Sequence, residues 1–190
     1  QSGETADTLA ALKEAKSHGA RILSIVNVVG SAIANASDDV IYTWAGPEIA
    51  VATTKAYSTQ LAVMYLISIY MADKLGMVTS GEYARFINDI ESLPEKVSQI
   101  LKDKQKIQYL ASLFYNSKSI FFIGRNLDYA VSLEGSLKLK EISYIHSEAY
   151  AAGELKHGTI SLIEDGTLVI ALATGEELFD KTVSNVKEVK

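Results

Sequence analysis

The sequence predicts an α/β protein in which a parallel β-sheet is covered by helices on both faces, and it predicts this arrangement twice along the chain. Short apolar segments suited to strands alternate with longer segments suited to helices. The apolar segments are continuous rather than alternating, as expected for strands buried on both faces of a parallel sheet. A faint repeat relates the two halves, since residues 2–5 before the first helix are echoed by residues 174–177 before the last one.

The first half, residues 1–100, is expected to form the later part of one domain together with a helical connector. Its expected elements are helix 6–16, strand 21–28, a short helical turn after Ser31, strand 40–44, helix 48–75 and a mostly helical stretch over 80–116. Gly19 and Gly76 end two of these helices, and Pro94 is expected to break the last one because proline removes a backbone donor.

The second half, residues 101–190, is expected to form the earlier part of a second domain. Its expected elements are strand 120–123, a turn at residues 124–126, helix 129–142, strand 168–173 and a closing helix up to Lys190. Each domain is expected to be incomplete in this chain.

Helix 129–142 carries charges among apolar residues. Glu134, Lys138 and Glu141 are spaced i, i+4 and i+7, which places them in one stripe at roughly 100° per residue. Apolar residues flank the stripe, so we expect it in the buried arc of the helix, where charges usually indicate a site. An ordinary surface ladder of ion pairs is the alternative interpretation. The opposite, outward-facing arc is expected to hold Ser132, Ser136, Lys140 and Ser143.

The first residues of the chain offer an anion site. Ser2 and Thr5 supply hydroxyls, Gly3 allows close approach of the backbone, and the helix that follows supplies unpaired amides, which together suit a phosphate monoester. A plain helix N-cap is the alternative interpretation. In the second copy, Glu176 and Glu177 would repel phosphate, so we expect one phosphate site per chain.

Composition excludes several other classes. A net charge of -5 gives no basic surface for nucleic acid. The chain has no cysteine and only three separated histidines, so no metal site is expected. The longest apolar run, residues 61–72, is shorter than the roughly 20 residues of a membrane span, and the polar N-terminus is no signal peptide, so we expect a cytoplasmic protein without a membrane partner. His18 and His146 are expected to be structural.

Three segments carry a family resemblance: residues 1–8, 45–56 and 137–158. They resemble the glutamine:fructose-6-phosphate aminotransferase family, the glucosamine-6-phosphate synthases. The third segment is highly specific, whereas the first alone would indicate only the wider sugar isomerase (SIS) superfamily. The resemblance covers essentially the whole chain and implies two tandem, doubly wound, flavodoxin-like SIS domains, fructose 6-phosphate as substrate, glucosamine 6-phosphate as product and no cofactor.

The resemblance also implies roles for individual residues. The residues implied to bind the substrate phosphate are Gln1, Ser2, Gly3 and Thr5, with Glu4 helping to shape the loop. Val51 and Thr53 are implied to line the sugar pocket, and Thr53 replaces the usual serine while keeping its hydroxyl.

The implied catalytic residues are Glu141, Lys138 and His157. Glu141 resembles the base that moves a proton between C1 and C2, and Lys138 resembles the cation that stabilises developing negative charge. His157 resembles the histidine that opens the sugar ring, which this family supplies from the neighbouring subunit of a homodimer. From the residues alone, a helix C-terminal cap is the favoured interpretation of His157, and only the resemblance favours the catalytic role.

Two family features lie outside this sequence: a glutaminase domain with a catalytic cysteine, and a C-terminal tail whose lysine captures the open-chain ketose. The fragment alone is therefore expected to bind substrate without turnover. A non-catalytic sugar-phosphate-binding module and a fructosamine-phosphate deglycase remain the alternative functions.

Overall fold

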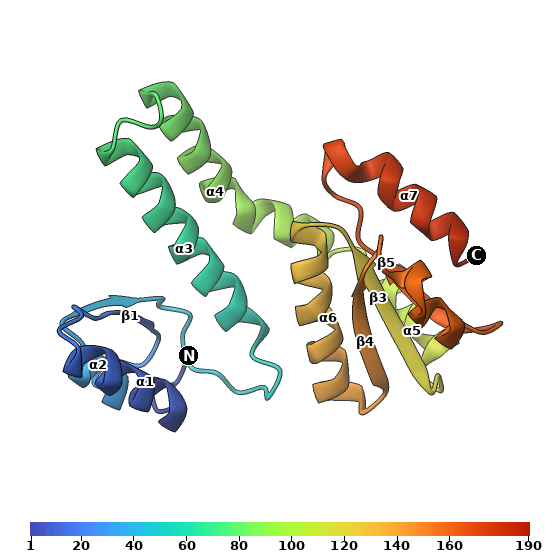
Figure 1. The fold of residues 1–190 in the computed structure, drawn as a ribbon, viewed down its shortest axis with the longest axis horizontal. Coiled ribbons are helices and arrows are strands. Elements are labelled where there is room, and N and C mark those ends of the chain that lie inside the picture. The colour runs from blue at the N-terminus through green and yellow to red at the C-terminus, as the bar shows by residue number, and fades with distance from the viewer. The chain divides into compact units, whose positions relative to one another are not determined.

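The computed structural model describes all residues from Gln1 to Lys190. Its internal contacts divide the chain into two units, Gln1–Lys102 and Asp103–Lys190. Figure 1 follows the order of helices and strands in both units. None of the helices combines the length and the apolar character that crossing a bilayer requires.

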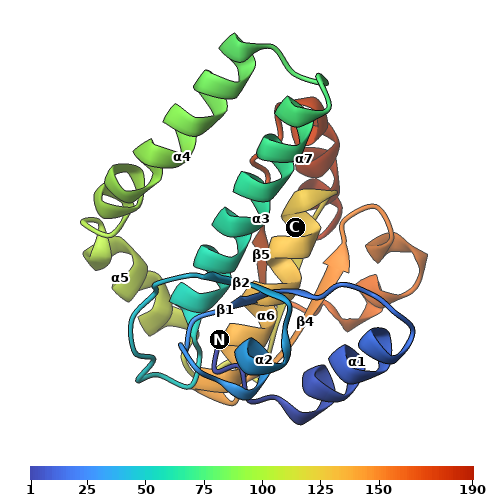
Figure 2. The ribbon, with the colours of Figure 1, turned by 90° about the vertical axis from the view of Figure 1, so that its left-hand side faces the viewer.

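The first unit begins with a small α/β layer. Its elements are helix α1 (Ala6–Ser17), strand β1 (Leu23–Val26), helix α2 (Ala32–Ala36) and strand β2 (Asp39–Tyr42). The two strands pair in parallel, from Leu23 opposite Asp39 to Val26 opposite Tyr42. Both helices lie close to this sheet (Figure 2) and enclose a core of Leu12, Val26, Ile33 and Ala34. The predicted order of elements is confirmed here, although both strands are shorter than expected.

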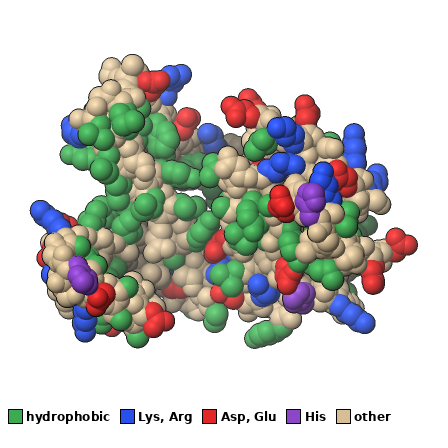
Figure 3. All heavy atoms as spheres, in the orientation of Figure 1, with side chains coloured by type: hydrophobic (Ala, Val, Ile, Leu, Met, Phe, Trp, Pro, Cys, Tyr) green, Lys and Arg blue, Asp and Glu red, His purple; other side chains and the backbone are tan.

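Two long helices follow, α3 (Thr54–Lys74) and α4 (Ser80–Ile100), which pack against each other as a hairpin (Figure 1). The rings of Tyr65 and Phe86 meet edge to face at 6.3 Å between centroids. Thr79 and Glu82 form a reciprocal capping box at the start of α4. Hydrophobic side chains gather on the surface of this hairpin in Figure 3. Tyr65 and Met71 are among the exposed hydrophobic residues of α3.

Two expectations about these helices were wrong. Helix α3 begins at Thr54 rather than at residue 48, because residues 45–53 form a loop held by its own side chains. Pro94 lies inside α4 instead of breaking it, and the break comes later, between Ile100 and the start of α5 (Lys104–Phe114). Pro94 lies on an exposed part of α4, where water can reach the carbonyl that the proline ring leaves without a donor.

The second unit is a three-stranded parallel sheet with helices α5, α6 and α7. The main elements are β3 (Ser119–Gly124), α6 (Leu127–Ser143), β4 (His146–Ala151), β5 (Leu168–Ala171) and α7 (Phe179–Glu188), with short 3₁₀ helices η1 (Leu155–His157), η2 (Thr159–Leu162) and η3 (Glu176–Leu178). The strand order is β4-β3-β5, and all pairs are parallel. Ile123, Ala152 and Leu155 form its buried core. The predicted α/β class with parallel sheets is therefore confirmed.

Strand β4 has no counterpart among the predicted elements. Its sequence, His-Ser-Glu-Ala-Tyr-Ala, alternates polar and small residues and lacks the continuous apolar run of β3. In this chain β4 lies at the edge of the sheet and pairs only with β3, from Ser119 opposite His146 onward. An edge strand needs less apolar character than a central one, which explains why the pattern did not reveal it.

The orientation of α6 was also predicted wrongly. Ser132 and Ser136, expected to face outward, are 0% and 2% exposed. Leu133 and Leu137, expected to be buried, are 48% and 43% exposed. The inner face is built from small residues because the helix lies close to the strands: a Cβ added at Gly135 would lie 3.0 Å from Cε1 of Phe122. Leucines on that face would hold the helix away from the sheet.

Candidate functional site

Helix α6 brings together the charged residues that its spacing predicted. Lys138 Nζ lies 2.6 Å from Glu141 Oε2 and 3.6 Å from Glu134 Oε1. Their side chains are only 20–28% exposed, so the stripe lies at the margin between the face packed on the sheet and the outer face. The hydrogen bond to Glu141 and its negative charge raise the pKa of Lys138 against the opposing effect of burial, so this amine stays protonated.

This pair has the components of a proton-transfer site next to a fixed positive charge. Oε2 of Glu141 accepts a hydrogen bond from Lys138 Nζ, and its other carboxylate oxygen has no hydrogen-bond partner in the chain. A carboxylate with a free oxygen can take a carbon-bound proton, and an adjacent ammonium can stabilise the negative charge that develops.

In the first unit, residues 1–5 form a tight loop against α2. Asn27 N donates to the Gln1 carbonyl at 3.2 Å, and Ile33 N donates to the Gly3 carbonyl at 2.9 Å. Gly3 has φ of 71°, and an added Cβ would lie 2.1 Å from Ser31 Oγ, so only glycine fits. Glu4 Oε1 accepts a hydrogen bond from Ala32 N at 2.8 Å, which directs this carboxylate away from the start of α1.

The donors of this loop remain available. Ser2 and Thr5 are exposed, and the Thr5 side chain makes no capping hydrogen bond although it is the N-cap of α1. The first amides of α1 have no intrahelical acceptor and carry the positive end of the helix dipole. Exposed hydroxyls beside the unpaired amides of a helix N-terminus suit an oxyanion such as phosphate.

The sequence echo of this loop in the second unit has a different backbone. Gly175, which corresponds to Gly3, has φ of -82°, and an added Cβ would meet no atom within 4 Å. Of the two copies, only residues 1–5 form the tight glycine turn.

Val51 and Thr53 lie in the loop between β2 and α3. Val51 is 83% exposed, and its carbonyl accepts a hydrogen bond from Thr53 Oγ1 at 2.9 Å. Thr53 has φ of 51°, a left-handed conformation that is unusual for threonine. Glu48 Oε1 accepts the amides of Ile49 and Ala50, each at 3.1 Å, and thereby fixes the loop that presents Val51. Sequence reasoning gave Glu48 no role, although it lies in a segment that carried the family resemblance.

His157 does not lie beside Glu141 within the second unit. It is exposed on η1 and makes no side-chain hydrogen bond or ion pair. Glu141 precedes the amino end of β4, whereas His157 follows its carboxyl end. A strand of six residues spans roughly 20 Å, so these two side chains belong to opposite ends of the sheet.

His146 and Glu148 lie on β4, with Nε2 and Oε1 3.6 Å apart. The hydroxyl of Tyr150 donates to the other oxygen of Glu148, and this bond raises the pKa of Tyr150 to about 12. These residues form a ladder along the edge strand, and no group of metal-ligating side chains is present in the chain.

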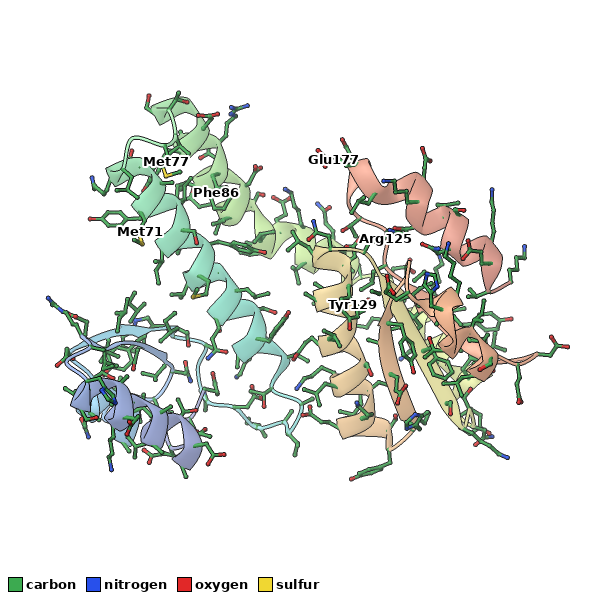
Figure 4. All side chains as sticks on the ribbon, viewed as in Figure 1. Met71, Met77, Phe86, Arg125, Tyr129 and Glu177 are labelled. Atoms are coloured by element: carbon green, nitrogen blue, oxygen red, sulfur yellow. The ribbon has the colours of Figure 1, made fainter.

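A cavity of about 220 Å³ lies at the carboxyl ends of β3 and β5, and sequence reasoning did not find it. Asp128 accepts hydrogen bonds from Thr174 N at 2.8 Å and from Thr174 Oγ1, and these lower the pKa of its carboxyl. Arg125 and Glu177, labelled in Figure 4, contribute to its lining. Its sequence signals were the turn at residues 124–126 and the repeat segment 174–177, which both contribute to the lining.

Fold and loop geometry together define an α/β protein with a parallel sheet and a glycine loop suited to an oxyanion. The SIS domain model matches residues 1–70 and 113–190, and the chain belongs to the SIS domain family. It is 62% identical over 190 residues to a protein of Caldanaerobacter subterraneus subsp. tengcongensis named glutamine–fructose-6-phosphate aminotransferase [isomerizing]. The protein of that name from Clostridium tetani is 62% identical over 189 residues. The alignments cover 100% of this chain but 31% of each relative, so the chain spans about a third of their length.

Solved structures agree with this relationship. The C-terminal domain of glucosamine-fructose-6-phosphate aminotransferase from Francisella tularensis matches 100% of this chain and 54% of its own, with a TM-score of 0.96 and 39% identity. A glucosamine-6-phosphate deaminase from Thermotoga maritima matches with a TM-score of 0.74 and 26% identity, over 100% of this chain and 55% of its own. The resemblance expected from the sequence is thus confirmed.

Proposed function

We propose that this chain is part of the isomerase portion of a glutamine:fructose-6-phosphate aminotransferase, which forms glucosamine 6-phosphate from fructose 6-phosphate and ammonia released from glutamine. The observation that carries the proposal is the Lys138–Glu141 pair at 2.6 Å, within a chain that is 62% identical along its whole length to relatives of that name. The relatives are about three times as long, which leaves room for a glutaminase domain in the full-length protein.

The phosphate is proposed to bind at the loop of Gln1, Ser2, Gly3 and Thr5. The exposed hydroxyls and the first amides of α1 support this role because they offer several donors next to one another, and Asp7 is the one acidic residue of that first turn. Val51 and Thr53 are proposed to line the sugar pocket. Binding at the phosphate fixes the position of the reacting carbons at the other end of the molecule.

The proposed chemistry is a proton transfer between neighbouring carbons. Ammonia condenses with the C2 carbonyl of the open-chain ketose and releases water. Glu141 then takes a proton from C1 and returns it at C2, while the C1 hydroxyl proton passes to the imine nitrogen, which leaves an aldehyde at C1 and an amine at C2. Lys138, which is protonated, stabilises the electron-rich intermediate between these two steps.

His157 is proposed to open the sugar ring in the site of a neighbouring subunit, so the full-length protein is expected to be a homodimer. The separation of His157 and Glu141 at opposite ends of β4 supports this, because a single second unit does not bring them together. Residues 1–100 and 101–190 are proposed to belong to two tandem SIS domains. The enzyme is proposed to need no cofactor and to act in the cytoplasm in amino sugar synthesis.

The test is formation of glucosamine 6-phosphate from fructose 6-phosphate and glutamine by the full-length protein. A fructosamine phosphate is offered in parallel reactions, because its hydrolysis would indicate a deglycase instead. Tight binding of fructose 6-phosphate without any product from either substrate would indicate a non-catalytic binding module. Either of these results would overturn the proposed function.

A further inference from the structure

Arg125, at the carboxyl end of β3, is held in one orientation by α7. Its Nε and Nη2 atoms both donate to Asn185 Oδ1, at 3.0 and 2.8 Å. Asn185 is only 4% exposed, and its amide nitrogen donates in turn to Glu188 Oε2 at 3.2 Å. These hydrogen bonds hold the planar guanidinium in one orientation.

Gly153 lies against this guanidinium. A Cβ added at Gly153 would lie 2.9 Å from Nη2 of Arg125 and 3.3 Å from Cζ and Nη1. Gly153 is not among the residues with positive φ, so its backbone conformation does not require glycine. Space rather than backbone conformation therefore disfavours a larger residue here, as long as Asn185 holds the Arg125 guanidinium in place.

Gly153 lies at the start of the turn that leads to His157. Ala152 N donates to the Gly124 carbonyl at 2.9 Å, beside Arg125, and Glu154 N donates to the Ala151 carbonyl at 2.8 Å. His157 N then donates to the Glu154 carbonyl at 3.0 Å. Leu155 between them is 2% exposed, so the turn is anchored in the core. An unbroken series of contacts thus joins the guanidinium to the backbone of His157.

We propose that Arg125 is a positioning residue for His157, with Asn185 as its anchor and Gly153 as the point of contact. The inference rests on the proposed function, in which His157 serves the site of the neighbouring subunit. Contact with the guanidinium determines how far residues 152–157 lie from the sheet. If this turn is displaced, the imidazole of His157 moves away from the sugar. A displacement of about 1 Å at a reacting group can cost roughly 100-fold in rate.

The test uses Gly153→Ala in the full-length protein. The kcat for glucosamine 6-phosphate is expected to fall about 10- to 100-fold, while the KM for fructose 6-phosphate changes less than about twofold, because the phosphate loop is untouched. Gly175→Ala is the matched control in the same unit, since its Cβ would meet no atom within 4 Å. In an Arg125→Ala background, Gly153→Ala is expected to cause no further loss, because the contact no longer exists.

Subunit mixing separates positioning from a merely structural effect. A Gly153→Ala subunit keeps its Glu141, and a Glu141→Gln subunit keeps its His157, so a mixed dimer contains one site with both residues intact. Mixtures of these two variants are expected to regain activity, and so are mixtures of His157→Ala with Glu141→Gln. If the His157→Ala mixture recovers and the Gly153→Ala mixture does not, the positioning role is wrong. If neither recovers, the shared site of the proposed function fails and the inference falls with it.

Discussion

Replacing Glu141 by glutamine is expected to lower the reaction rate strongly and the stability of the fold only slightly. The side chain of Glu141 is 28% exposed and forms one ion pair, at 2.6 Å to Lys138. A pair of this kind, spaced i and i+3 on a helix, stabilises the fold by about 1 kcal/mol or less. Against a typical stability of roughly 5–15 kcal/mol, such a loss leaves almost all of the protein folded.

The expected loss of activity is much larger. A positioned general base contributes about 10²- to 10⁴-fold to a rate, which corresponds to roughly 3–5 kcal/mol of activation free energy. We therefore expect Glu141→Gln in the full-length protein to lower kcat by at least 100-fold, with a urea midpoint close to that of the unmodified protein. Exchange of the C1 hydrogen of fructose 6-phosphate with solvent deuterium is expected to fall in parallel. Glu164→Gln, an exposed control with the same chemical change, is expected to keep full activity. A Glu141→Gln variant that keeps more than a tenth of the kcat would refute the assignment of the base.

Three further predictions concern the phosphate loop, the cavity and the core. Thr5→Val removes one hydroxyl from the loop and is expected to raise the KM for fructose 6-phosphate about tenfold or more. Thr5→Ser keeps a hydroxyl and is expected to keep the KM of the unmodified protein. Equal KM values for both variants would contradict phosphate binding at this loop. Asp128→Asn is expected to lower the free energy of unfolding, measured with urea at pH 7, by about 1 kcal/mol. The pKa of Asp128 is lowered from 3.8 in the folded protein. The difference in unfolding free energy between the two proteins should therefore shrink as the pH falls below about 4, and a difference that stays constant would contradict this role of Asp128. In urea unfolding, Ile123→Ala, at 0% exposure on β3, is expected to cost about 2–5 kcal/mol, and Ile142→Ala, at 65% exposure on α6, less than about 0.5 kcal/mol. A loss at Ile142 as large as the loss at Ile123 would show that α6 is oriented as its apolar pattern suggested.

The sequence predicted those parts of the fold that depend on local patterns. The apolar run of β3, the helix of α6 and the spacing of Lys138 and Glu141 are all local, and the structure places the two charges in contact. The glycine turn at Gly3 was likewise recognisable because a hydroxyl-rich loop before a helix has a distinctive composition.

Features that depend on distant residues were not predictable in this way. The inner face of α6 is made of small residues because the ring of Phe122 lies close to Gly135, which no helical wheel reveals. Arg125 and Asn185 are 60 positions apart in the chain, so no spacing rule connects them. Strand β4 lacked an apolar run because it lies at the edge of the sheet in this chain.

A crystal structure of the full-length protein with fructose 6-phosphate tests the central claim most directly. We predict that the phosphate lies on the hydroxyls of Ser2 and Thr5 and the first amides of α1, and that C1 lies within about 3.5 Å of a Glu141 oxygen. A phosphate bound elsewhere, or a sugar whose C1 lies far from Glu141, would contradict the account.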